Sequence, residues 1–271
     1  MEYHIERVRI GDGYIEIRYP LRKVLYRGRS EYQEIVIAES DLGKMLILDG
    51  VLQFTTYDEE IYHETLTLTT FKEGFRRVLI LGGGDGGAAK ALKNKYPMIS
   101  IDIVDIDPEV TYKVLKYIPE VPGKVFEMEG VKLINMDAHQ YVRRCKVKYD
   151  YIIGDLTDIR FEGEAGSQVN RLYTSEYISE LKEILTNHGV ITYHIGGYNI
   201  DKKFILDVYN IFKEVFKYVK VYAVYIPSFI DLWTFISGSD GEFMLRSLRH
   251  KIYDFTDDIK DYETGSIYHV G

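Results

Sequence analysis

The sequence predicts an α/β protein in which a small antiparallel β domain precedes a larger domain with a mainly parallel sheet. Residues 1–56 contain β-rich runs and a hairpin signal, whereas from residue 57 short apolar runs alternate with longer mixed segments. Strands and helices in alternation are typical of βαβ units, which place helices on both faces of a parallel sheet. We therefore divide the chain into an N-terminal β domain, residues 1–56, and a Rossmann-like domain, residues 57–271.

The N-terminal domain is predicted from three runs. Residues 14–19 alternate apolar and polar side chains, which suits a half-buried strand, and residues 34–39 form a second β-rich run. Residues 44–54 carry Asp49-Gly50 between two apolar stretches, and this pair favours the tight turn of a hairpin.

The larger domain is predicted to begin with a helix over residues 58–70, with Asp58 as its N-cap. Residues 241–271 show no clear pattern. The predicted strands are 78–81, 101–105, 131–135, 151–155, 189–194, 219–224 and 233–237, and the predicted helices are 88–95, 108–116, 175–185 and 201–216.

Composition excludes several classes of protein. The chain of 271 residues is 46% hydrophobic and 28% charged, which is typical of a globular protein and not of a disordered one. No apolar run approaches the ~18 residues of a spanning helix, so no membrane partner is expected. The single cysteine, Cys145, and an N-terminus without a secretory pattern predict a cytoplasmic protein. The net charge of −8 disfavours a nucleic-acid partner and is compatible with a cationic ligand.

The sharpest local feature is a glycine-rich turn between a predicted strand and a predicted helix. Gly82, Gly84 and Gly87 have the G-x-G-x-x-G spacing of nucleotide-binding loops. Glycine lets a ligand approach bare backbone, and the start of a helix offers unpaired N–H groups. We therefore predict that Gly82 and Gly84 contact a nucleoside-bearing ligand, with a plain strand-to-helix turn as the alternative.

Acidic residues end the next two predicted strands. Asp105 lies 23 positions after Gly82, where a carboxylate can accept both hydrogen bonds of a ribose diol. Asp107 precedes Pro108 and is more simply a helix cap. Asp137 follows the third strand of the series. Because the carboxyl ends of parallel strands line the ligand crevice, Asp105 and Asp137 are predicted to face it.

Asp85 narrows the choice of ligand. A carboxylate inside the glycine-rich turn would repel a pyrophosphate and oppose the helix dipole. A sulfonium or ammonium group would be attracted to it. Asp85 therefore favours an S-adenosyl compound over a dinucleotide.

The strand over residues 151–155 delivers two more carboxylates, Asp155 and Asp158, to the predicted crevice. With a cationic substrate, one carboxylate can hold an ammonium group while the other accepts a proton. Capping of a turn is the alternative for such a pair. No third carboxylate or histidine follows at metal-ligand spacing, so no metal is predicted.

Taken in order, several motifs make the chain resemble the polyamine aminopropyltransferases of the spermidine synthase type, from about residue 30 to residue 238. The run Leu-Asp-Gly-Val-Leu-Gln followed closely by Asp-Glu-Glu-Ile-Tyr-His-Glu is the most specific part of the likeness. The motifs are residues 30–33, 48–53, 58–64, 82–87, 105, 137–138, 155–158 and 172–174.

The resemblance implies a reaction in which an aminopropyl group passes from decarboxylated S-adenosylmethionine, a co-substrate, to an amine, leaving methylthioadenosine. It further implies a methyltransferase-like Rossmann domain after the small β domain, a homodimer or homotetramer, no prosthetic group and no metal.

Residue roles are implied motif by motif. Asp155 is the implied catalytic base. Tyr62 and His63 are neighbours on a predicted helix, so packing is the alternative for either of them. The residues implied to hold the nucleoside are Gln33, Asp105, Asp137 and Ala138, and those implied to line the amine path are Tyr62, His63, Asp85 and Asp158.

Two segments depart from the common family pattern. Residues 159–170 form a longer loop that carries Glu162 and Glu164 and lacks proline, and residues 226–233 read Ile-Pro-Ser-Phe-Ile-Asp-Leu-Trp. Both resemble the thermospermine synthase branch, so we predict spermidine or a longer polyamine as the acceptor, with Asp231 and Trp233 among its contacts. Putrescine or agmatine is the alternative acceptor.

Two other function classes stay open at this stage. An S-adenosylmethionine-dependent methyltransferase would share the glycine-rich turn and Asp105 but would need a partner for the α-carboxylate, for which Asp85 is badly placed. A non-catalytic polyamine-binding protein would keep the pocket and could dispense with Asp155.

Overall fold

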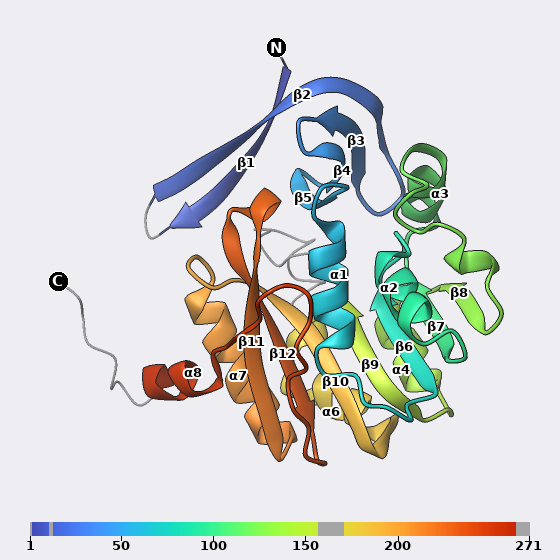
Figure 1. Ribbon diagram of the computed structural model, residues 1–271, viewed down its shortest axis with the longest axis vertical. Coiled ribbons are helices and arrows are strands. Elements are labelled where there is room, and N and C mark those ends of the chain that lie inside the picture. The colour runs from blue at the N-terminus through green and yellow to red at the C-terminus, as the bar shows by residue number, and fades with distance from the viewer. Residues whose placement is uncertain (1, 11–12, 157–170, 264–271) are drawn as a thin grey trace.

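The computed structural model describes residues 2–10, 13–156 and 171–263, which form two β-sheets (Figure 1). The N-terminal sheet is antiparallel, with strand order β1-β2-β3-β4-β5. Its bounds are β1 Glu2–Ile10, β2 Gly13–Arg29, β3 Glu34–Ser40, β4 Gly43–Leu48 and β5 Val51–Thr55.

The predicted hairpin joins β4 to β5. Asp49 and Gly50 both have positive φ, 45° and 84°, and Leu48 pairs with Val51 across the turn. Two positive φ values in a two-residue loop match the twist of the flanking strands, which is why an Asp-Gly pair marks this position.

The second sheet is mixed, and its parallel part comes from the predicted alternation. The strand order is β13-β11-β12-β10-β9-β6-β7-β8. β10, β9, β6, β7 and β8 are parallel to one another, whereas β12 pairs antiparallel with β10, β11 with β12, and β13 with β11. The bounds are β6 Arg77–Gly82, β7 Ser100–Asp105, β8 Val131–Asn135, β9 Tyr149–Asp155, β10 Leu185–Gly197, β11 Tyr218–Ile226, β12 Asp231–Ser239 and β13 Tyr253–Asp254.

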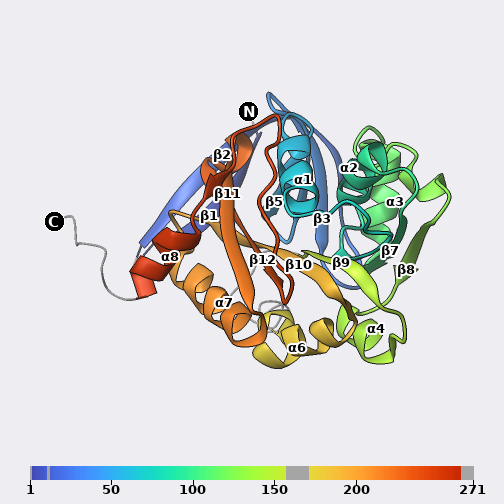
Figure 2. The same ribbon diagram turned by 60° about the horizontal axis from the view of Figure 1, so that its bottom comes forward.

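Helices cover both faces of this sheet (Figure 2). α1 and α2 pack on one face, and α4, α6 and α7 pack on the other. The bounds are α1 Glu59–Leu68, α2 Gly87–Lys95, α3 Pro108–Tyr117, α4 Ala138–Arg144, α6 Ser175–Glu183, α7 Lys202–Val215 and α8 Thr256–Glu263, with short 3₁₀ turns η1 Val125–Glu127, η2 Arg171–Tyr173 and η3 Pro227–Phe229.

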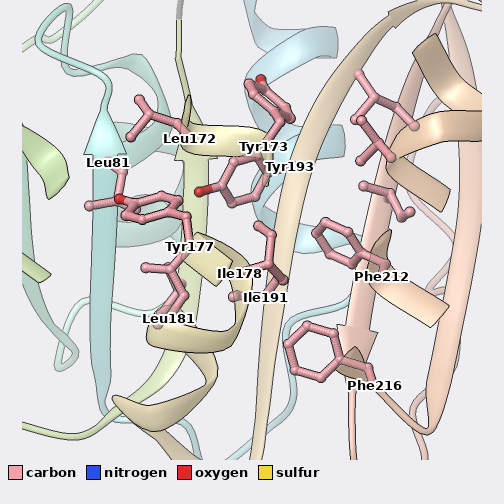
Figure 3. Packing of buried hydrophobic residues seen from close by; sticks show 14 of the residues in the cluster. Leu81, Leu172, Tyr173, Tyr177, Ile178, Leu181, Ile191, Tyr193, Phe212 and Phe216 are labelled. Atoms are coloured by element: carbon pink, nitrogen blue, oxygen red, sulfur yellow. The ribbon is translucent and has the colours of Figure 1, made fainter. Parts of the chain in front are cut away.

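Apolar side chains of the sheet pack against those of the helices on the face covered by α4, α6 and α7 (Figure 3). Tyr177 of α6 and Phe212 of α7 are fully buried around Tyr193 of β10. Burial of such large side chains supplies most of the driving force that fixes the sheet and hence the ends of its strands.

The N-terminal sheet sits on the larger domain through α3. Val110 and Val114 of this helix are buried against Ile35 and Ile37 of β3. The apolar surface shared by the two units places the N-terminal hairpins above the carboxyl ends of the parallel strands. Among the described residues, no helix is both long enough and apolar enough to cross a membrane.

The caps of the helices differ from the prediction at one position. Asp107 caps α3, since its carboxylate accepts a hydrogen bond from Glu109 N at 3.0 Å. Asp58 occupies the N-cap position of α1, but its side chain makes no capping bond. Its carboxylate instead accepts from Ser228 N, in the turn between β11 and β12, at 2.7 Å.

Some elements were absent from the prediction. In β1 the apolar Ile5 is exposed and the charged Glu6 is buried, so the usual alternation of buried apolar and exposed polar residues cannot be recognised in the sequence. The Glu6 carboxylate accepts a hydrogen bond from Leu52 N. β13 and α8 lie in the segment without a sequence pattern. This segment returns to α1, where Arg249 pairs with Glu60 and Glu64.

Candidate active site

A cavity of about 410 Å³ opens at the carboxyl ends of β6, β7 and β9, beneath the N-terminal sheet. Its size is typical of a small-molecule site. The predicted residues that line it are Gln33, Tyr62, His63, Gly82, Gly84, Asp85, Asp105, Asp137, Ala138, Asp155 and Trp233.

The glycine-rich turn leaves no room for side chains. At Gly82, where φ is 80°, an added Cβ would lie 1.9 Å from the carbonyl oxygen of Asp155. At Gly84 it would lie 2.6 Å from the carboxylate of Asp105. Glycine is therefore required here because the backbone passes close to two neighbouring strand ends.

Asp105 is held by backbone donors at the rim of β7. Its carboxylate oxygens accept hydrogen bonds from Gly84 N and Asp107 N, each at 2.8 Å. Burial raises the pKa of Asp105 to about 6, although these two N–H bonds act in the opposite direction. The carboxylate retains acceptor capacity toward the cavity.

Gln33 and Asp137 flank Asp105. The Gln33 side-chain amide donates to the Asp107 carboxylate at 2.9 Å, so its partner is a side chain and not a neighbouring strand backbone. Asp137 caps α4 by accepting from Gln140 N at 2.9 Å, and its second oxygen pairs with the Arg171 guanidinium. Arg171 lines the cavity but was not predicted, because nothing in its local sequence marks it.

Asp155, at the end of β9, has one satisfied and one unsatisfied oxygen. The Tyr62 hydroxyl donates to its Oδ1 at 2.8 Å. Its Oδ2 is buried and has no hydrogen-bond partner within the described part of the chain. Burial and the nearby Asp85 raise the pKa of Asp155, while the charge of His63 opposes that rise. A buried carboxylate in this state is prepared to accept a proton.

His63 lies beside Asp155 and carries a charge. Its Nδ1 lies 2.6 Å from Glu59 Oε2, and its Nε2 lies 3.5 Å from Asp85 Oδ1. Burial works against the charged form, but Asp85 and Glu59 outweigh it and raise the pKa of His63 to about 9. The imidazole is therefore an imidazolium at neutral pH.

Asp85 is held at the N-terminus of α2, where it accepts from Gly87 N at 2.6 Å, and burial raises its pKa. One ligand atom each from His63, Asp85 and Asp155 lies within 4.8 Å of the others. This spacing would suit a cation, but both nitrogens of an imidazolium carry protons, so His63 in this state is not a metal ligand. These residues are too far apart in the sequence to form a recognisable metal motif.

Aromatic side chains form one wall of the cavity. Phe229 and Trp233 have ring centroids 4.6 Å apart, and Trp233 is stacked with His194 at 6.2 Å. Tyr62 contacts both His194 and Phe229 edge-on. His194 was not predicted as a site residue, although its position at the end of a predicted strand was a usable signal.

The turn that carries Phe229 is fixed from two directions. The Asp58 carboxylate accepts from the backbone N–H and the hydroxyl of Ser228, at 2.7 and 2.9 Å. The Tyr19 hydroxyl, from β2, donates to the Ser228 carbonyl at 2.9 Å. The N-terminal sheet therefore contributes to the shape of the aromatic wall.

The structure does not bring Asp231 to the cavity. Its side chain is buried, and its carboxylate accepts from the Asn199 side-chain amide at 2.6 Å and from Leu232 N at 2.7 Å. These bonds turn Asp231 toward the end of β10. Asp158, Glu162 and Glu164 lie outside the described residues.

The fold is shared with solved spermidine synthases. A crystal structure of spermidine synthase in complex with the transition-state analogue AdoDATO superposes with a TM-score of 0.79 and 26% identity, covering 89% of this chain and 80% of that one. The predicted fold class, a small antiparallel sheet before a Rossmann-like domain, is confirmed.

Curated relatives of similar sequence are named as aminopropyltransferases or as a thermospermine synthase. A polyamine aminopropyltransferase from Korarchaeum cryptofilum is 40% identical over 73% of this chain, which spans 60% of that relative's length. The thermospermine synthase ACAULIS5 from Arabidopsis thaliana is 35% identical over 83% of this chain and 67% of its own length.

Domain matches divide the chain into two parts. Residues 7–56 match the spermidine synthase tetramerisation domain, which indicates an oligomeric protein. Residues 55–249 match the spermine/spermidine synthase domain. This second match covers well over half of the chain and agrees with the predicted resemblance, so the chain belongs to the spermine/spermidine synthase family.

Proposed function

We propose that this chain transfers an aminopropyl group from decarboxylated S-adenosylmethionine to spermidine or a longer polyamine and releases methylthioadenosine. The observation that carries this proposal is the buried Oδ2 of Asp155, which has no hydrogen-bond partner among the residues that the structure describes, at a cavity also lined by Asp85 and Asp105. A carboxylate in this position can remove a proton from a substrate amine.

The donor fits the nucleoside end of the cavity. Asp105 retains acceptor capacity for the ribose hydroxyls, and the glycine-rich turn lets the nucleoside approach the backbone. Asp137 and Ala138 line the cavity beside it and complete the proposed nucleoside contacts, with Gln33 placed through Asp107. Asp85 is the proposed partner of the cationic aminopropyl end, since a carboxylate there stabilises positive charge.

The reaction then needs only deprotonation and alignment. The acceptor nitrogen loses a proton to Asp155 and forms a bond to the aminopropyl carbon, while the C–S bond breaks and its electron pair returns to sulfur. Removing the proton from a primary amine of ordinary pKa costs about 4–5 kcal/mol at pH 7. The sulfonium is already a good leaving group, and the cavity holds the reacting atoms in line.

The acceptor is proposed to lie along the aromatic wall of Tyr62, Phe229 and Trp233. Aromatic faces suit both a methylene chain and an ammonium group. Asp231 is not part of this contact, because its carboxylate is bound to Asn199 and Leu232. A wall without a hydroxyl at Phe229 favours a long acceptor over a short diamine, which needs polar contacts at closely spaced ends.

Assembly and domain division are part of the proposal. β5 ends at Thr55 and α1 begins at Glu59, which supports a boundary near residue 56. The match of residues 7–56 to a tetramerisation domain supports a homotetramer, with a homodimer as the alternative.

One assay tests the proposed function. The protein is incubated with decarboxylated S-adenosylmethionine and, separately, putrescine, agmatine, spermidine or spermine, and methylthioadenosine and the alkylated amine are quantified. We expect the highest kcat/KM with spermidine or spermine. Higher kcat/KM with putrescine or agmatine would overturn the acceptor assignment, and no methylthioadenosine with any amine would favour a binding protein. Transfer of a methyl group from S-adenosylmethionine would favour a methyltransferase, and loss of activity on chelation would indicate a required metal.

A further inference from the structure

Four charged side chains form a continuous row from the edge of α2 into the cavity. Lys90 Nζ lies 2.9 Å from Glu59 Oε1. The other oxygen of Glu59 lies 2.6 Å from His63 Nδ1, and His63 Nε2 lies 3.5 Å from Asp85. Glu59 and His63 are one helical turn apart on α1, so the helix itself aligns them.

The side chains at the centre of this row are buried, so the electrostatic interactions between their charges are screened little by water. Glu59 is 5% exposed and His63 is 1% exposed. Burial alone would raise the pKa of Glu59, but the hydrogen bonds and charges of His63 and Lys90 outweigh it and lower that pKa. An ionised carboxylate accepts only, so His63 must donate through Nδ1. In the imidazolium form Nε2 also carries a proton, and this N–H faces Asp85.

We propose that Glu59 is a positioning residue that fixes His63 as an imidazolium, and that this charge keeps Asp155 ionised for catalysis. Lys90 orients Glu59 by holding its second oxygen. This inference deepens the proposed function and rests on it for the role of Asp155.

The charged groups that face His63 come from three elements. They are Glu59 on its own helix, Asp85 on the turn between β6 and α2, and Asp155 at the end of β9. Burial raises the pKa of both Asp85 and Asp155, and the charge of His63 opposes that rise in each of them. Without that charge, two neighbouring buried carboxylates would face each other, and one would become protonated.

Glu59→Gln reverses the polarity of the contact. Lys90 donates to whichever atom faces it, so the amide oxygen turns toward Lys90 and the amide N–H groups turn toward His63. His63 Nδ1 must then accept, which requires a neutral imidazole. The matched control is Glu60→Gln, the next residue of α1, whose carboxylate is exposed and pairs with Arg249.

The first readout is the titration of His63 in the full chain without substrate. Nitrogen NMR of histidine-labelled protein, assigned with His63→Asn, follows the imidazole nitrogens against pH. The wild type and Glu60→Gln are expected to titrate near pH 9. In Glu59→Gln the midpoint is expected to fall by about 1–3 pH units. An unchanged midpoint in Glu59→Gln would overturn the proposal.

The second readout is the pH profile of kcat/KM. In Glu59→Gln the acid limb is expected to move up by about one pH unit, so the loss of rate is larger at pH 7 than at pH 9. A structural defect alone would lower the rate by the same factor at both pH values, which would refute the assigned role.

Two arms keep the test decisive. Glu59→Asp retains the charge and is expected to keep most of the wild-type His63 midpoint. A midpoint in Glu59→Asp as low as that expected for Glu59→Gln would show that the carboxylate charge does not hold the His63 proton and would overturn the proposal. The NMR titration needs no turnover, so the state of His63 is decided even where no polyamine is alkylated. If the wild type alkylates no polyamine, the proposed function is refuted, whereas the assignment of the His63 charge is still decided by the NMR titration.

Discussion

Replacing Asp155 by asparagine removes the proposed proton acceptor and little else. The Tyr62 hydroxyl donates to Oδ1 at 2.8 Å, and the amide oxygen of asparagine can accept the same bond. The change therefore falls on Oδ2, the buried oxygen that has no partner among the described residues. Because an amide nitrogen donates and cannot accept a proton, the substrate ammonium loses its base.

The expected effect follows from the protonation of the amine. An amine with a pKa near 10.4 is free base in about one molecule in 2,500 at pH 7, which corresponds to about 4.6 kcal/mol. Loss of a positioned general base lowers kcat by about 10²–10⁴-fold. The residual rate should then rise about tenfold per pH unit toward pH 10, because it depends on the free amine alone.

Release of methylthioadenosine at saturating donor and spermidine measures this effect between pH 6 and 10. Asp150→Asn is the control, because it makes the same chemical change on the same strand. Asp150 accepts from Arg76 N and Arg77 N at the opposite end of β9, so its variant is expected to lose stability but to keep kcat within about threefold. If Asp155→Asn keeps more than about a tenth of the wild-type kcat, the assignment of the base is wrong.

Three further predictions concern the same cavity. Asp85 should make decarboxylated S-adenosylmethionine bind about tenfold or more tightly than S-adenosylmethionine, and Asp85→Asn should narrow that ratio in calorimetric titrations; equal wild-type affinities would favour a methyltransferase. Asp105 has a pKa of about 6 and must be ionised to accept the ribose hydroxyls, so donor affinity should fall about tenfold per unit below pH 6, and Asp105→Asn should abolish that dependence. The Tyr62 hydrogen bond lowers the pKa of Asp155, so Tyr62→Phe should shift the acid limb of kcat/KM upward and lower it about 3–10-fold, whereas an unshifted limb would contradict the bond's role.

The elements that sequence reasoning could predict are those whose signal is local. Buried parallel strands read as short apolar runs, and the glycine-rich turn follows directly from β6. Asp105 and Asp155 could be placed at one edge of the sheet because the carboxyl ends of parallel strands share that edge. The fold class and the acidic end of the cavity therefore needed no tertiary information.

Residues that reach the cavity from distant segments were harder to predict. Arg171 and His194 enter through the order of the strands and the packing of η2, which no spacing in the sequence reveals. Asp231 shows the opposite error. A carboxylate in a motif was expected to contact the acceptor, but the neighbouring Asn199 provides donors that satisfy it inside the protein.

The first two turns of α1 explain why one short acidic motif has such influence on the cavity. Asp58 holds Ser228 and so places the aromatic wall, whereas the adjacent Glu59 holds His63. One turn later, Tyr62 donates to Asp155, and His63 stands between Asp85 and Asp155. Asp58 precedes the helix in a non-helical conformation and Glu59 begins it, so two carboxylates adjacent in sequence point to different walls of one site. Spacing of four residues pairs Glu59 with His63 on the same side of the helix, whereas Asp58 reaches the aromatic wall through Ser228 and Tyr62 reaches the opposite carboxylate, Asp155.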